Sequence, residues 1–280
     1  MSGRRPAGRL SIVATPIGNL SDITLRALRV LADADVIAAE DTRTTRKLLT
    51  QHGIRTPLVA YHEHNETVRT PELLGRLQRG ESVALVSESG TPSISDPGYR
   101  LVHAAVDADI HVEPVPGPSA ILAALVVSGL PTDAFVFEGF LPRRASERRR
   151  RLETLKNEPR TVVVFEAPHR LDAAVTDMLE VLGDRRVALC RELTKMHEDV
   201  RRSTLSELAS ALRRRPVKGE IVLVLEGSSE AAPDLDGAVA EALERIAGGE
   251  SVREATRAVA TERGVPRRPL YDRVLEARDA

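Results

Sequence analysis

The chain has 280 residues, of which 42% are hydrophobic and 29% are charged, with 40 basic and 41 acidic side chains. The apolar fraction and the balanced charge exclude intrinsic disorder, and the length suits one large domain or two smaller ones. Because the chain has one cysteine, Cys190, an internal disulfide framework and a site of several thiolates are excluded, which favours a reducing compartment.

Residues 10–128 alternate between short apolar runs and helical patterns. We expect strands at 10–15, 36–39, 57–60, 82–87 and 110–115, and helices at 42–52, 66–79 and 99–108. Ser21 and Asp22 are expected to cap another helix, which has Leu25, Leu28 and Leu31 on one face. This alternation predicts a mostly parallel sheet with helices on its faces, and such sheets bind ligands beyond the carboxyl ends of their strands.

The second half repeats this alternation with more polar interruptions. We expect strands at 135–138, 161–165, 186–191 and 220–226, a loop at 139–145, and helices at 146–157, 169–182 and 206–215. The prediction is an α/β fold with two α/β domains, residues 1–130 and 131–230, and a helical appendage over residues 231–280. The second boundary is placed within the polar stretch 227–236. In the appendage, Gly264-Val265-Pro266 separates two short helices with a spacing that resembles a helix-turn-helix.

Four segments rich in glycine, proline or other small residues lie at predicted strand ends. They are Thr15–Leu20, Ser87–Gly98, Pro116–Ala120 and Lys218–Glu220. Small residues let the backbone approach a ligand closely, and free N–H groups near a helix start favour polar or anionic groups. Each segment alone is typical of an ordinary turn, but their shared position indicates one common crevice.

Several site types are excluded. There is no G-x-x-x-x-G-K-S/T motif and no G-x-G-x-x-G after the first strand, which disfavours nucleotide triphosphatases and ordinary dinucleotide enzymes. His62 and His64 lack further ligands, so no metal site is expected. Since no apolar core follows the basic start of the chain and no apolar run nears the ~20 residues of a membrane span, we expect a soluble cytoplasmic protein without a membrane partner.

Eight segments carry a resemblance to a known family. In chain order they are TPIGNLSDIT, AAEDTR, ALVSESGTP, SDPGY, PGPSA, FEGFLP, CRELTK and KGE. They closely resemble the 16S rRNA cytidine 2′-O-methyltransferase family of the tetrapyrrole methylase superfamily. The resemblance implies S-adenosylmethionine bound in a cleft between two α/β domains, a homodimer, and methylation of a cytidine ribose in the decoding region of 16S rRNA. One departure is that Glu88-Ser89 stands where the family usually has Asp-Ala.

The resemblance also implies which residues contact the cofactor. They are Pro16, Gly18, Ser87, Glu88, Ser89, Gly90, Thr91, Pro92, Ser119, Ala120, Ala167, Arg191, Lys218, Gly219 and Glu220. A ribose hydroxyl that attacks a methyl group must lose its proton, and the candidate general bases are Lys195, Glu166 and Glu192. Lys195 qualifies if neighbouring charges lower its pKa, and a structural ion pair is the alternative role for Arg191 and Glu192.

A run of arginines follows the FEGFLP segment. We predict that RNA phosphates contact Arg143, Arg144, Arg148, Arg149, Arg150, Arg151, His169 and Arg170, and Arg201-Arg202 could extend this stripe. The alternative is a solvated helix face, since Glu147 and Glu153 offer local ion-pair partners.

Two other functions stay open from the sequence. One is a small-molecule methylase of the corrin/porphyrin pathway, which the arginine run and the 231–280 appendage disfavour. The other is a non-enzymatic RNA-binding or ribosome-assembly protein, which would not bind S-adenosylmethionine.

Overall fold

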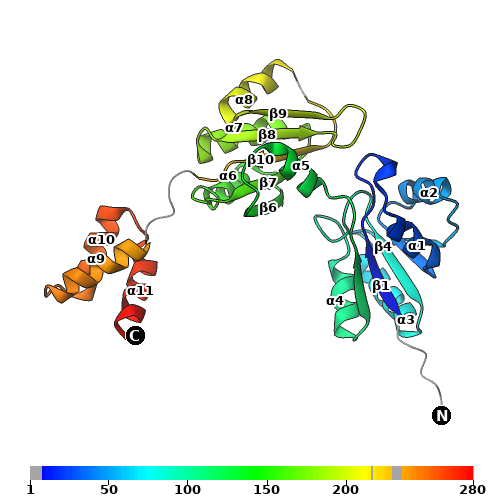
Figure 1. The fold of residues 1–280 in the computed structure, drawn as a ribbon, viewed down its shortest axis with the longest axis horizontal. Helices are drawn as coiled ribbons and strands as arrows, with labels where there is room; N and C mark the ends of the chain where they lie inside the picture. Colours follow the sequence, from blue (N-terminus) through cyan, green and yellow to red (C-terminus); the bar gives the residue numbers. More distant parts are fainter. Residues whose placement is uncertain (1–7, 216, 229–234, 280) are drawn as a thin grey trace, which may run out of the picture.

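The first sheet is parallel throughout. A computed structural model describes residues 8–215, 217–228 and 235–279, and shows two sheets side by side with a group of helices apart from them (Figure 1). The first sheet has the order β3-β2-β4-β1-β5. Its strands are β1 (Arg9–Val13), β2 (Val36–Ala39), β3 (Leu58–Ala60), β4 (Ser82–Val86) and β5 (His111–Val115). The predicted parallel α/β architecture is confirmed.

Helices cover both faces of this sheet. They are α1 (Leu25–Asp33), α2 (Thr42–Gln51), α3 (Glu66–Gln78) and α4 (Tyr99–Asp107). Leu31 and Leu49 bring α1 and α2 into one apolar cluster, while Leu77 and Leu101 bring α3 and α4 into another. The predicted cap of α1 is wrong by one turn. Ser21 and Asp22 lie in a 3-10 turn (Leu20–Asp22), and Thr24 caps α1 because its hydroxyl accepts from Ala27 N at 3.0 Å.

The second sheet is mixed rather than parallel, in the order β6-β7-β10-β8-β9. Its strands are β6 (Phe135–Phe140), β7 (Thr161–Glu166), β8 (Arg186–Arg191), β9 (Asp199–Thr204) and β10 (Ile221–Leu225). β10 runs antiparallel to both of its neighbours. The sequence did not predict β9, because an edge strand pairs on one side only and Asp-Val-Arg-Arg-Ser-Thr lacks a strong apolar alternation. β6 extends two residues into the expected loop, with a register shift between Phe137 and Gly139.

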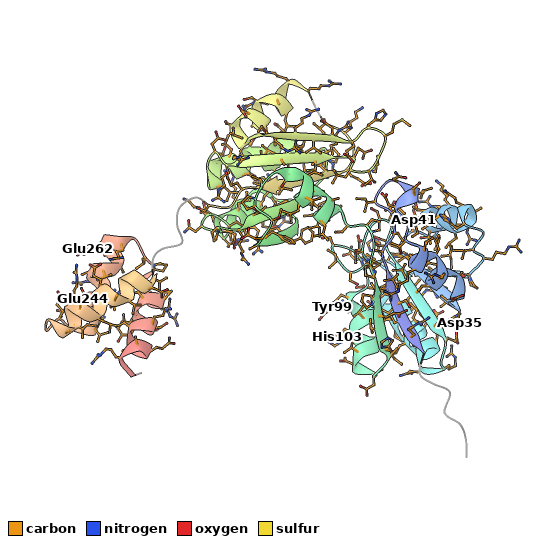
Figure 2. All side chains as sticks on the ribbon, viewed as in Figure 1. Asp35, Asp41, Tyr99, His103, Glu244 and Glu262 are labelled. Carbon is orange, nitrogen blue, oxygen red and sulfur yellow. The ribbon has the colours of Figure 1, made fainter. Side chains whose placement is uncertain are left out.

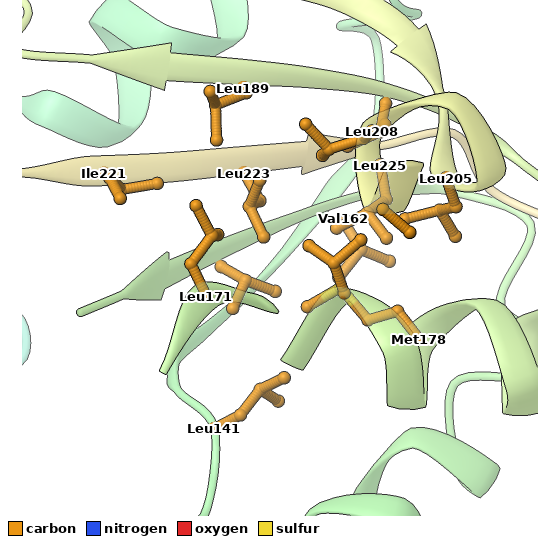
Figure 3. Packing of buried hydrophobic residues seen from close by; sticks show 14 of the residues in the cluster. Leu141, Val162, Leu171, Met178, Leu189, Leu205, Leu208, Ile221, Leu223 and Leu225 are labelled. Atoms are coloured by element: carbon orange, nitrogen blue, oxygen red, sulfur yellow. The ribbon is translucent and has the colours of Figure 1, made fainter. Parts of the chain in front are cut away.

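The two faces of the second sheet are covered by different parts of the chain. On one face, α7 (Leu171–Leu182) and α8 (Leu205–Arg214) build the largest core cluster of the described residues, with Leu171, Met178 and Leu208 against the strands (Figure 3). Leu152 of α6 (Ala145–Glu153) belongs to the same cluster. On the other face lies α5 (Ala120–Ser128), although it precedes the predicted boundary at 130–131. Ile17, from the turn after β1, joins this same cluster, so the first domain contributes one turn residue to the core of the second sheet.

The last three helices pack on one another. They are α9 (Leu235–Ala247), α10 (Val252–Arg263) and α11 (Arg267–Asp279), and their shared core includes Ala242, Val259 and Leu270. Gly264 ends α10 in a left-handed conformation, as the predicted turn requires. The predicted boundary at 227–236 falls largely outside the described residues, as do Met1–Ala7 of the N-terminal stretch. Within the described ranges, the structure contains no helix with the length and apolar character to cross a membrane.

Candidate active site

Three turns of the first sheet lie against one another beyond the ends of β1, β4 and β5. Thr15 N donates to Gly90 O at 2.8 Å, and Gly90 N returns a bond to Thr15 O at 3.1 Å. A Cβ atom on Gly117 would lie 3.0 Å from Ala14 Cβ, so the turn after β5 also passes close to the first. Since β1, β4 and β5 are parallel, their carboxyl ends share one edge, and the predicted convergence of these turns is observed.

The second sheet meets this edge through the end of β6 and the loop after β8, at a place we call the domain junction. Asn19 N donates to Thr194 Oγ1 at 3.1 Å. A Cβ atom on Gly18 would lie 2.4 Å from Lys195 Cγ, so only glycine permits this approach. Ser95 approaches Gly139 in the same way, 3.1 Å from where a Cβ atom would be. The junction therefore brings segments from both halves of the chain together.

Lys195 sits in a cluster of carboxylates. Its Nζ lies 3.0 Å from Glu192 Oε1 and 3.0 Å from Glu220 Oε1, and Glu192 Oε1 also accepts from Glu220 N at 2.8 Å. Burial lowers the pKa of Lys195, but the hydrogen bonds to Glu192 and Glu220 outweigh it and raise the pKa above its ordinary value. The condition set for Lys195 as a base, that neighbouring charges lower its pKa, is therefore not met, because both neighbours are anionic.

Glu166 forms a buried ion pair. Its carboxylate is covered from solvent, accepts from Ala167 N at 2.7 Å and lies 3.2 Å from Arg170 Nε. Burial raises the pKa of Glu166, and the bond from Ala167 N and the charge of Arg170 oppose that rise. Arg170 also donates to Leu141 O at 2.5 Å, so the pair fixes the loop after β6. This geometry favours a positioning role for Glu166 and leaves Arg170 little freedom to bind a phosphate.

The turn after β4 carries an acidic group that the sequence analysis missed. Glu88 N donates to Glu40 Oε2 at 3.1 Å, which brings the ends of β2 and β4 together. Burial, together with the charges of Glu40 and Glu88, raises the pKa of Asp96 to about 7, while a hydrogen bond with Ser87 lowers it. The signal was available in the Ser-Asp-Pro-Gly run, but its environment depends on Glu40, fifty-six positions earlier.

The remaining predicted cofactor residues are placed as follows. Ser119 caps α5, accepting from Leu122 N at 3.5 Å, and Ala120 begins that helix. Arg191 donates to Lys218 O at 3.2 Å and to His197 O at 3.0 Å, so it ties two loops together. Gly219 lies against Glu192, where a Cβ atom would be 2.6 Å from the Glu192 side chain.

Most of the arginine run on α6 is engaged within the protein. Arg148 is buried against Asp177, with Nε to Oδ2 at 2.7 Å, so the prediction that it contacts RNA is wrong. The other ion pairs of the run are Arg144–Glu147, Arg149–Asp177, Arg149–Glu180 and Arg151–Glu138. Arg143 and Arg150 are exposed, and among the described residues neither forms an ion pair. Arg202 donates to Ser128 O at 3.1 Å and so closes the end of α5 instead of extending the stripe.

Comparisons with known proteins agree with this architecture. Residues 9–209 match the family model described as Tetrapyrrole (Corrin/Porphyrin) Methylases. The chain is similar to proteins named "Ribosomal RNA small subunit methyltransferase I", with 47% identity to that of Halalkalibacterium halodurans and 50% to that of Mesorhizobium japonicum. Both alignments cover 96% of this chain, and they cover 95% and 92% of the relatives.

A solved structure shows the same fold. It is the uroporphyrin-III C-methyl transferase of Thermus thermophilus complexed with S-adenyl homocysteine, which is 21% identical with a TM-score of 0.56. The superposition covers 78% of this chain and 97% of that one. At this level of identity the likeness concerns the fold alone.

Proposed function

The chain belongs to the tetrapyrrole (corrin/porphyrin) methylase family, and from that membership we propose that it methylates the 2′-hydroxyl of a cytidine in the decoding region of small-subunit rRNA. S-adenosylmethionine is the proposed methyl donor. The observation that carries the proposal is the identity of 47–50%, over almost the full length, with relatives whose name is that of a small-subunit rRNA methyltransferase.

The residues at the junction fit a cationic donor. Two carboxylates at the turn after β4, Glu40 and Glu88, raise the pKa of Asp96, and the acidic character of this group favours a sulfonium group nearby. At the start of α5, Ser119 caps Leu122 N, and the two N–H groups before it have no acceptor within the helix, which favours a carboxylate there. S-adenosylmethionine supplies an activated methyl group when it is bound.

The chain's own residues must align the ribose oxygen and take its proton. Alignment of reacting groups contributes up to ~7–11 kcal/mol in intramolecular analogies, and a general base contributes roughly 10²–10⁴-fold. Of the three predicted bases, Lys195 and Glu192 lie at the junction, whereas Glu166 is covered by Arg170. Hydrogen bonds from Glu220 N and Lys195, opposed by partial burial, hold the pKa of Glu192 below its ordinary value. Glu192 is thus ionised at neutral pH but a weak base. Lys195 is protonated at rest, but its amine is the stronger base once a substrate separates it from a carboxylate, so we place Lys195 first among the candidates.

The direct test is a methyl-transfer assay with purified protein and labelled S-adenosylmethionine. Small ribosomal subunits from cells without this protein should gain one methyl group, which mass mapping places on the ribose of a cytidine. Naked 16S rRNA and precorrin are offered in parallel. Transfer to the tetrapyrrole alone would favour the small-molecule methylase, and the absence of calorimetric S-adenosylmethionine binding would favour a non-enzymatic protein.

The homodimer implied by the resemblance stays part of the proposal. Large apolar side chains are exposed on α4 and α5, among them Tyr99, Val106 and Val126. Exposed apolar side chains of this size are common at protein interfaces. Light scattering of the purified protein measures the mass that decides between one chain and two.

A further inference from the structure

A basic pocket lies on the second domain, next to the loop that reaches the junction. It is a hollow of about 350 Å³ to which four cationic side chains contribute, each from a different element. Arg191 ends β8, Arg201 belongs to β9, Arg215 follows α8, and Lys218 precedes β10. Val217 completes the wall. A cavity of this size accommodates a small ligand or part of a large one.

The positive charge of this pocket is largely uncompensated. Asp199 pairs with Arg201 at 2.7 Å, and among the described residues no carboxylate pairs with the other three cations. Arg191 donates hydrogen bonds to the backbone carbonyls of Lys218 and His197. These bonds hold the guanidinium in the wall of the pocket but do not neutralise its charge. Four cations with one ionic partner repel one another, so an anion in the hollow would be stabilised.

The pocket adjoins the proposed reaction site. Arg191 precedes Glu192, and Glu192 bonds Lys195, whose side chain lies over Gly18. Across the junction, the first domain presents its own open groove of about 570 Å³ along α2, where Arg43, Arg46 and Lys47 are exposed. α2 begins after Asp41, which Figure 2 shows at the end of the first domain that faces the second. The first domain therefore carries a basic groove on a helix that begins at the end facing the second domain.

We propose that the basic pocket formed by Arg191, Arg201, Arg215 and Lys218 binds backbone phosphates of the RNA substrate and holds the strand beside the junction. This inference rests on the proposed function. Arginine forks match the paired oxygens of a phosphate, and three arginines from separate elements define a fixed position for it. A methyl donor with a sulfonium group would be repelled by the same four cations. The pocket thus assigns Arg191 and Lys218 to RNA, in place of the cofactor role that the resemblance implies.

The test removes two charges that the resemblance does not connect with the cofactor. Arg201→Gln combined with Arg215→Gln is compared with wild type by fluorescence anisotropy, using a labelled 16S rRNA fragment that spans the decoding region. Each lost phosphate contact lowers the slope of log affinity against log salt by about 0.7–0.9. We expect the slope to fall by about 1.4–1.8 and the affinity at low salt to fall at least tenfold. S-adenosylmethionine binding, measured by calorimetry, should be unchanged.

Two further proteins serve as controls. Arg160→Gln with Arg186→Gln removes two charges at the opposite ends of β7 and β8, so its slope should match wild type within error. Arg201→Lys with Arg215→Lys keeps both charges, so its slope of log affinity against log salt should be close to that of wild type. This protein therefore separates loss of charge from any loss of thermal stability in the glutamine protein. An unchanged slope in the glutamine protein, or an equal loss in the opposite-edge control, would overturn the inference.

The proposed function has a separate readout. If wild type binds the fragment but transfers no methyl group to it or to small subunits, the proposed function fails while the pocket can still bind phosphate. If calorimetry shows that the glutamine protein loses S-adenosylmethionine instead of RNA, the pocket belongs to the cofactor and the inference fails alone.

Discussion

Lys195 shows how one residue depends on its immediate partners. Its ammonium group bridges Glu192 and Glu220, and Gly18 leaves the space for its side chain. Because the carboxylates stabilise the charged form, the free base is scarce at neutral pH. A substrate that separates the amine from either carboxylate would lower its pKa and make it a better base.

We therefore predict that Lys195→Ala lowers single-turnover methyl transfer by roughly 10²–10⁴-fold while S-adenosylmethionine binding changes little. Since the raised pKa keeps the amine protonated, the wild-type rate should rise with pH from neutral into the alkaline range. Rapid-quench assays at several pH values measure both effects. The matched control is Lys156→Ala, an exposed lysine after α6. Full turnover in the Lys195 variant would remove this side chain from the mechanism.

Asp96 shows the opposite electrostatic situation. Its pKa is raised from 3.8 to about 7 by burial and by two carboxylates, so folding disfavours its ionised form. Between pH 4 and 7 the folded protein retains a proton that the unfolded chain has lost. The free energy of unfolding therefore falls as pH rises through this window, and the loss is complete above pH 7.

Asp96→Asn should remove this penalty. We expect a gain in unfolding free energy on the order of 1 kcal/mol at pH 8, after allowing for solvent screening, and no gain at pH 4. Urea denaturation at both pH values tests this. Asp35→Asn is the control of opposite sign, because hydrogen bonds from Ser82 hold the pKa of Asp35 below its ordinary value. That variant should lose stability at pH 8 and lose less at low pH.

At the scale of elements, the contact between α6 and α7 depends on a buried ion pair. The side chains of Arg148 and Asp177 are 6% and 4% exposed, and Arg148 also donates to Arg143 O at 3.2 Å. One arginine of a surface run thus points inward, where it joins two helices and the loop before α6. Removing Arg148 leaves the buried Asp177 carboxylate with one cationic partner, Arg149, in place of two.

Arg148→Ala should lower the free energy of unfolding by about 1.5–3 kcal/mol, because hydrogen bonds to a charged group are lost while Arg149 still pairs with Asp177. Arg150→Ala, two positions along the same exposed run, should change it by less than about 0.5 kcal/mol. Urea titrations followed by circular dichroism compare the two variants. Equal effects would show that the ion pair contributes no more than an ordinary surface arginine.

At the scale of the whole molecule, α9, α10 and α11 form a unit with its own core. Their residues also lie outside the family match, which ends at 209. We predict that a chain ending at residue 228 keeps the thermal midpoint of the α/β part within a few degrees and still binds S-adenosylmethionine. Differential scanning calorimetry and titration calorimetry measure these properties, and loss of the cooperative transition would contradict the prediction. Anisotropy with the same rRNA fragment tests whether the appendage contacts RNA.

Local signals in the sequence determined the elements and the turns. Strand periodicity, small residues at strand ends and the family segments predicted the α/β fold and the turns that meet beyond β1, β4 and β5, since these depend on nearby residues. Two features were not predicted correctly. The start of α1 was misplaced because several residues compete to cap it, and the strand β9 was missed because an edge strand has a weak sequence signal.

Only the tertiary structure decided what each charge does. Glu220 raises the pKa of Lys195, Glu40 raises the pKa of Asp96, and Asp177 forms an ion pair with Arg148. Each partner lies 25 or more positions away in the chain. Electrostatic energy depends on distance and burial in space, which chain order does not encode. The same reason explains why a conspicuous run of arginines is mostly neutralised on α6, while four cations scattered from 191 to 218 converge on one pocket.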